Sequence, residues 1–144
     1  DEFTIALDGI PLTNSLDDVL SRMIERVNSA FRSRKDAIAA FFVESRGDPA
    51  MRSRGAEASQ VGSLLFSKVL SRFAEEIQGD VNAKIDLAYR TILASMMHEI
   101  LFDVSNENTS ERDRQLSIML ASYLRASESH HSSQPLGLVN ETDE

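Results

Sequence analysis

The sequence of 144 residues predicts an all-α protein, on three observations. Apolar residues recur at helical spacing over four turns near the start of the chain. Capping residues, glycines and a proline divide much of the rest into segments of helix length. No segment shows the alternation of apolar and polar residues that is typical of a half-buried strand. We therefore expect a bundle of helices without a sheet.

The first helix is expected to begin at Ser15, after an irregular segment or linker remnant over residues 1–14. Ser15 precedes Asp18 by three residues, close to the pattern of a capping box. Apolar residues then follow at the i, i+3, i+4, i+7 spacing of an amphipathic helix: Leu16, Val19, Leu20, Met23, Ile24, Val27, Ala30 and Phe31.

A second, short helix is expected over "AIAAFFVES", residues 37–45, with Ser33 and Asp36 as its cap. The segment is apolar nearly all round, so we expect it to be buried on most sides. Its length also allows a strand, but the sequence offers no partner strand. Gly47 is a natural stop for this helix.

A third helix is expected to begin with Asp48 as its N-cap and Pro49 in its first turn. It should run to about Gln78, where Gly79 ends it. We expect its inner face to comprise Ala58, Val61, Leu64, Leu65, Phe66, Val69, Leu70, Phe73 and Ile77.

Asp80 is the expected cap of a fourth helix over residues 81–104, which is mostly apolar between Leu87 and Phe102 and should be covered on more than one side. Ser110 with Asp113 is expected to start a fifth helix, and residues 127–144 should be a disordered tail. The helical domain thus spans residues 15–126.

The composition excludes several kinds of site. The chain has no cysteine, which excludes disulfides, thiolate nucleophiles and zinc–thiolate sites. Its formal net charge of −8 opposes binding to duplex DNA, because the affinity of a protein for DNA depends on neutralising the phosphates. There is no apolar run near 18 residues and no signal peptide, so we expect a soluble cytoplasmic protein without a membrane partner.

Three arginines gather where the second helix meets the third: Arg46, Arg52 and Arg54. Acidic residues lie beside them in the sequence, and no glycine-rich phosphate loop is present. We expect a solvated corner between two helices, with phosphate recognition as the alternative.

The order of these segments resembles the C-terminal effector-binding and dimerisation domain of TetR-family transcriptional regulators. The similar stretches are "AAFFVESRGDPAMRSR", "VNAKIDLAYRTILASMMHEILFD" and "RQLSIMLASYLRA", within residues 15–126. The resemblance implies a five-to-six-helix bundle whose last two helices form a four-helix bundle across a homodimer. It also implies a ligand-sensing domain of a repressor whose helix-turn-helix, absent from this sequence, would contact DNA.

The sequence predicts no enzyme, no cofactor and no metal site. His98 is the sole histidine outside the tail, and no nucleophile-elbow motif accompanies the many serines. The acid nearest to His98 is Glu99, whose adjacent position does not fit the Glu-x-x-His spacing of carboxylate-bridged metal bundles.

A cavity for a small hydrophobic or aromatic effector fits better, since helical domains bind such molecules between helices. Bulky and adaptable side chains supply candidate lining, with two polar residues among them as anchors, although core packing is the alternative for each. These candidates are Phe31, Phe41, Phe42, Phe66, Phe73, Tyr89, Met96, Arg90 and His98.

The apolar last two helices also predict a two-fold interface between copies of the chain. Its candidate residues are Leu93, Met97, Leu101, Met119, Leu120 and Tyr123. Packing within one chain is the alternative. A second function remains open, a helical protein-interaction adaptor that uses these helices and binds no small molecule.

Overall fold

The computed structural model describes residues 15–102 and 108–127, in which every regular element is helical. The all-α prediction is therefore confirmed. The elements are α2 (Leu16–Arg32), α3 (Lys35–Ser45), α4 (Pro49–Leu70), the short 3₁₀ turn η1 (Ser71–Phe73), α5 (Val81–Phe102) and α6 (Thr109–Arg125). The predictions for residues 1–14, for the end of the fourth helix and for most of the tail lie outside the described residues.

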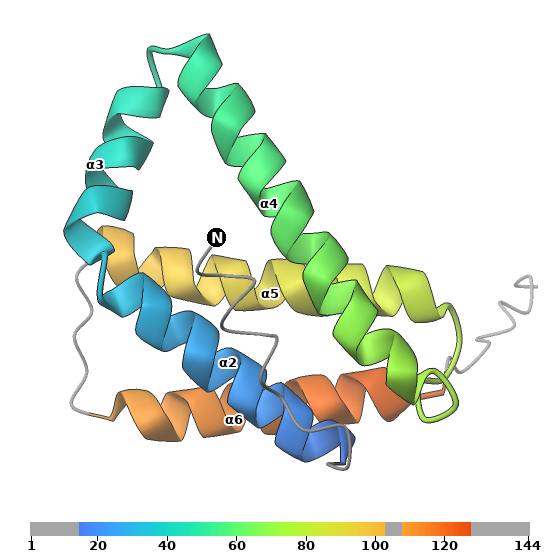
Figure 1. Ribbon diagram of the computed structural model, residues 1–144. Helices are drawn as coiled ribbons and strands as arrows, with labels where there is room; N and C mark the ends of the chain where they lie inside the picture. The colour runs from blue at the N-terminus through green and yellow to red at the C-terminus, as the bar shows by residue number, and fades with distance from the viewer. Residues whose placement is uncertain (1–14, 103–107, 128–144) are drawn as a thin grey trace, which may run out of the picture.

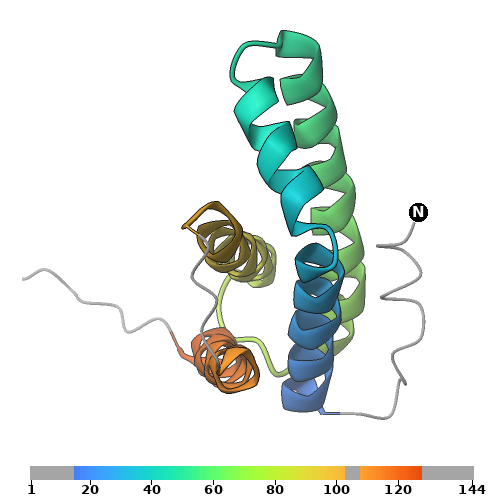
Figure 2. The ribbon, with the colours of Figure 1, turned by 90° about the vertical axis from the view of Figure 1, so that its left-hand side faces the viewer.

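The helices form two layers. Figure 2 shows α5 and α6 side by side, facing a layer made of α2, α3 and α4. In Figure 1, α3 continues from α2 and meets α4 at a tip that projects beyond α5. The core lies between the two layers, where α2 packs chiefly against α6 and α4 packs against α5.

Helix α2 matches its prediction closely. The Ser15 hydroxyl accepts a hydrogen bond from the Asp18 amide at 3.3 Å and caps the helix. The apolar stripe is buried almost completely, at Leu16, Val19, Leu20, Met23, Ile24 and Val27. This stripe is the part of the core that lies against α5 and α6.

Helix α3 is not buried on most sides, and that prediction is wrong. Ser45 is its sole buried residue, and Val43 is 68% exposed. The helix packs chiefly on α4 and α5, with a smaller contact to α2, so its other faces meet solvent. Ser33 does not cap it either, because its hydroxyl donates to the Ala30 carbonyl and no side chain caps the first turn.

Helix α4 begins as predicted, with the Asp48 carboxylate accepting from the Ala50 amide at 2.8 Å. It ends at Leu70, earlier than predicted, and η1 leads to a turn at Gly79 with φ 82°.

The inner face of α4 also differs from the prediction. Its buried residues, Gly62, Phe66 and Leu70, all lie in the C-terminal half, whereas Val61 and Leu64 are exposed. The N-terminal half forms the projecting tip with α3, so little of the chain covers it.

Helix α5 starts at the predicted cap, where the Asp80 carboxylate accepts from the Ala83 amide at 3.0 Å. It is buried along one face, while Leu87, Leu101 and Phe102 are exposed, so a single chain does not cover it on more than one side. Helix α6 begins without a side-chain cap. No described helix has the length and apolar character needed to cross a membrane.

Lys84, in the first turn of α5, links the start of this helix to the end of α6. Its side chain is buried, and its amine donates to the carbonyls of Tyr123 at 3.1 Å and Ala126 at 2.5 Å. The Gln78 amide donates to the Leu124 carbonyl at 3.0 Å. Lys84 and Gln78 thus supply donors to carbonyls at the end of α6, where a helix offers few donors of its own.

Candidate ligand-binding site

An apolar cavity of about 400 Å³ lies between α3, α4 and α5, close to the end of α2. These helices form the triangular arrangement visible in Figure 1. The walls are made mainly of aromatic, aliphatic and small side chains. They comprise Phe31, Ile38, Phe41, Phe42, Gly55, Ala58, Ser59, Val61, Gly62, Tyr89, Leu93 and Met97.

Small residues on α4 leave room for this cavity. Gly55, Ala58, Ser59 and Gly62 recur at the i, i+3, i+4, i+7 spacing of one helix face. A Cβ added at Gly55 would meet Phe41 Cε1 at 3.3 Å, so glycine allows the aromatic ring to approach the helix backbone. Facing this stripe, α3 supplies the bulky part of the wall.

Tyr89 supplies a polar anchor in the cavity wall. Its hydroxyl donates to the Ser59 carbonyl at 3.0 Å, which leaves the phenolic oxygen able to accept a hydrogen bond from a ligand. Burial raises the pKa of Tyr89 above its usual value of 10.0, so the side chain stays neutral at physiological pH. Its ring packs on Phe66 of the core, with centroids 5.7 Å apart.

Four of the predicted pocket residues line this cavity, Phe31, Phe41, Phe42 and Tyr89. The remaining aromatic and methionine candidates lie elsewhere, since Phe66 and Met96 are buried in the core and Phe73 packs against it. The two polar candidates also lie outside. Arg90 is exposed and forms an ion pair with Asp86 at 2.8 Å. His98 is exposed and lies against Phe102, with ring centroids 4.9 Å apart and ring planes tilted by 41°.

The predicted interface residues lie in four different environments. Leu93 and Met97 line the cavity, and Leu120 is buried in the core of its own chain. Tyr123 is half-buried against that core. Leu101 and Met119 are exposed.

Besides Leu93 and Met97, which had been assigned to the interface, sequence reasoning missed six lining residues: Ile38, Gly55, Ala58, Ser59, Val61 and Gly62. The regular spacing of small residues on α4 is a signal that could have found four of them.

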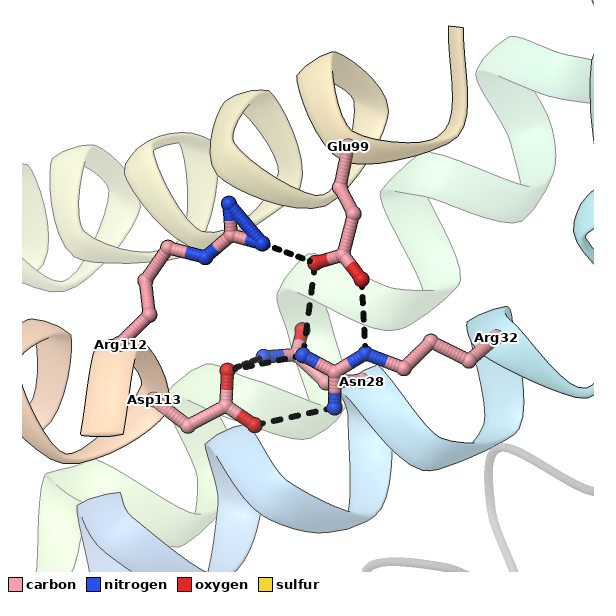
Figure 3. Close-up of polar contacts among 5 residues, drawn as sticks. All are labelled: Asn28, Arg32, Glu99, Arg112 and Asp113. Atoms are coloured by element: carbon pink, nitrogen blue, oxygen red, sulfur yellow. Dashed lines mark hydrogen bonds and ion pairs between the residues drawn. The ribbon is translucent and has the colours of Figure 1, made fainter. Parts of the chain in front are cut away.

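A cluster of charged side chains lies beside Phe31 and joins α2, α5 and α6 (Figure 3). The Arg32 guanidinium lies between two carboxylates, 2.9 Å from Glu99 and 3.1 Å from Asp113. Arg112 reaches Glu99 at 3.0 Å, and the Asn28 amide nitrogen donates to Asp113. The hydrogen bond from Arg32 holds the pKa of Glu99 below its usual value of 4.5.

Phe31 lines the cavity and Arg32, its neighbour in α2, holds this cluster together. The end of α2 is thus in contact with the cavity on one side and tied to α5 and α6 on the other.

No protein-family model, curated protein or solved structure matches this chain. Within residues 15–102 and 108–127, no three His, Asp or Glu side chains are grouped as the ligands of a metal ion would be.

Proposed function

We propose that this chain is the ligand-sensing and dimerisation domain of a TetR-like transcriptional repressor, with a small apolar or aromatic effector bound between α3, α4 and α5. The observation that carries the proposal is the cavity of about 400 Å³ with apolar walls and Tyr89 as an anchor. Its volume is within the range of small-molecule sites in proteins, and its lining has their usual chemistry. The order of elements that suggested the resemblance supports the proposal further.

The end of α2 is the element through which an effector would act. A ligand that displaces Phe31 also displaces Arg32, which is bound to Glu99 of α5 and Asp113 of α6. Binding would therefore favour one orientation of α2 over another, by as much as the ligand's affinities for the two states differ. A DNA-reading domain preceding α2 would change its position accordingly.

Exposed apolar residues on the layer of α5 and α6 support the dimerisation part of the proposal. Figure 2 shows that α2, α3 and α4 cover this layer on one side. The large apolar side chains exposed on these two helices are Leu87, Leu101, Phe102, Ile118 and Met119. A second copy of the chain would bury them in an interface that resembles a protein core.

Thermal unfolding with a panel of small aromatic and aliphatic compounds tests the sensing function. A compound at 100 times its Kd stabilises the folded protein by about 2.7 kcal/mol, which raises Tm by several degrees. Ala58→Leu places a larger side chain on the cavity wall and should abolish the shift. Ala56→Leu, exposed on the same helix outside that wall, is the matched control and should retain it.

The exposed residues of α5 and α6 also favour a second candidate, a protein-interaction adaptor. An adaptor would show no Tm shift with any compound, and Ala58→Leu would leave its partner binding unchanged. A Tm shift that Ala58→Leu removes would exclude this candidate.

A further inference from the structure

A second cavity, of about 280 Å³, adjoins the first at the corner where α3 leads into α4. It is lined by Phe42, Val43, Ser45, Arg46, Arg52 and Leu101. Phe42 belongs to the walls of both cavities. The two spaces therefore share one aromatic wall residue, which is 39% exposed.

The second cavity differs from the first in its charge. Its wall includes two residues that carry guanidinium groups, Arg46 and Arg52. Neither group has an ion pair or side-chain hydrogen bond with the described residues, whereas Arg32 and Arg125 are bound to carboxylates.

Among the described residues, the acids that neighbour these two arginines in the sequence form no ion pair with them. The Asp48 carboxylate accepts from the amides of Ala50 and Met51 at the start of α4, and Glu57 accepts from Ser53. Two guanidinium groups next to apolar side chains can therefore bind an anion from solution, since guanidinium donors match carboxylate and phosphate oxygens in geometry and charge.

We infer that the two cavities take one ligand, a free amphiphilic anion with an apolar chain or ring system and a terminal carboxylate or phosphate. The apolar part occupies the first cavity, beside Phe41 and Tyr89, and passes Phe42. The anionic group binds Arg46 and Arg52 in the second. This inference rests on the proposed sensing function and narrows its ligand from apolar molecules in general to anionic amphiphiles.

The closing experiment compares decanoate, below its micellar range, with decanol as a neutral molecule of equal chain length. Isothermal titration calorimetry should show tighter binding of decanoate to the wild type. The double variant Arg46→Gln, Arg52→Gln should bind decanoate about tenfold more weakly and should bind decanol with unchanged affinity. Arg54→Gln, which alters an exposed arginine of the same segment outside both cavity walls, is the matched control and should change neither.

Chain length tests whether the apolar part enters the first cavity. Each methylene that is removed from the carboxylate should weaken binding about fourfold, the loss expected for burial of one CH₂ group. Ala58→Leu, which narrows that cavity, should weaken the binding of decanoate and of decanol alike.

The outcomes separate this inference from the function on which it rests. Suppose that decanoate and decanol bind with equal affinity, that substitution of both arginines does not change it, and that Ala58→Leu abolishes binding. This result would overturn the anion site and would leave the proposed sensing function intact. Failure of both to bind would overturn the inference, and the compound panel would then decide on the sensing function. Binding to phosphatidylglycerol vesicles without binding of monomeric decanoate would assign the anion to a membrane lipid and overturn a free ligand.

Discussion

Lys84 is a charged residue in the core that contacts backbone carbonyls instead of a carboxylate. Its side chain is 4% exposed, and its amine lies 5.2 Å from the centre of the Tyr123 ring. The amine donates to carbonyls at the end of α6, and hydrogen bonds that involve a charged group contribute more to stability than neutral ones. The favourable placement of a cation at a helix C-terminus adds to this effect.

We predict that Lys84→Met lowers the free energy of unfolding by about 2 kcal/mol, because it removes a charged donor that ties the start of α5 to the carbonyls at the end of α6. Urea denaturation followed by circular dichroism measures this change. The exposed Lys68→Met should alter stability by less than about 0.5 kcal/mol. Equal effects of the two substitutions would contradict the role of Lys84.

Glu99 makes stability depend on pH. Its pKa in the folded protein is below 4.5, chiefly because Arg32 donates a hydrogen bond to its carboxylate. The stabilisation is therefore complete above the unfolded pKa of about 4.5 and is lost as pH falls through the lower, folded value.

We predict that Glu99→Gln lowers the free energy of unfolding by about 1–2 kcal/mol at pH 7, and that this difference shrinks as pH falls well below 4.5. Urea denaturation at several pH values measures it. Glu75→Gln, an exposed residue without a described partner, should show no such pH dependence. A difference that persists unchanged in acid would rule out the carboxylate as its source.

These residue roles could not be read from the sequence. Lys84 is about 40 positions from the carbonyls that it contacts, and Arg32 is 67 positions from Glu99. Such pairs depend on how α5 meets α2 and α6, which local patterns do not specify. The caps at Ser15, Asp48 and Asp80 were predictable because donor and acceptor lie within three residues.

Helix α3 is the element with the least support from the rest of the fold. It buries a single residue and has no side-chain cap, whereas α2 buries seven residues and is capped by Ser15. Few buried apolar contacts allow a helix to open locally without unfolding the whole domain. Helix α3 nonetheless supplies three bulky side chains to the wall of the first cavity, namely Ile38, Phe41 and Phe42.

Hydrogen exchange followed by mass spectrometry should show this difference. We predict that amides of α3 exchange at least about tenfold faster than those of α2, and that a bound ligand slows exchange in α3 while leaving α6 unchanged. Equal protection of α2 and α3 without ligand would contradict the view that α3 opens independently.

At the scale of elements, the sequence predicted which helices exist better than it predicted their environment. The apolar run in α3 indicates burial by composition, yet the element is at the projecting tip, where neighbouring helices cover little of it. The end of α4 at Leu70 was missed because apolar periodicity continues through Phe73 and Ile77, both of which pack against the core after the helix has ended.

The exposed apolar surface of the described residues predicts a homodimer. The layer of α5 and α6 exposes several large apolar side chains on a chain whose core is already complete. Apolar patches of this kind mark association surfaces in soluble proteins. The resemblance found in the sequence leads to the same expectation.

Light scattering coupled to size exclusion tests this association. We predict a mass near twice 16.0 kDa for the wild type at micromolar concentration. Met119→Glu places a charge on the exposed face of α6 and should yield monomers. Leu64→Glu places a charge at an exposed position of α4 and should leave the dimer intact. A wild-type monomer at that concentration would contradict the proposed dimerisation.

The pairing of α2 with α6 has a consequence for synthesis on the ribosome. Roughly 90 residues must be translated after α2 before its main partner is complete, which takes about 5–20 s. Throughout that time the apolar stripe of α2 lacks its cover and is open to chaperones or to other nascent chains. Loss of α6 by premature termination would thus first affect α2, the described helix that lies farthest from α6 in the sequence.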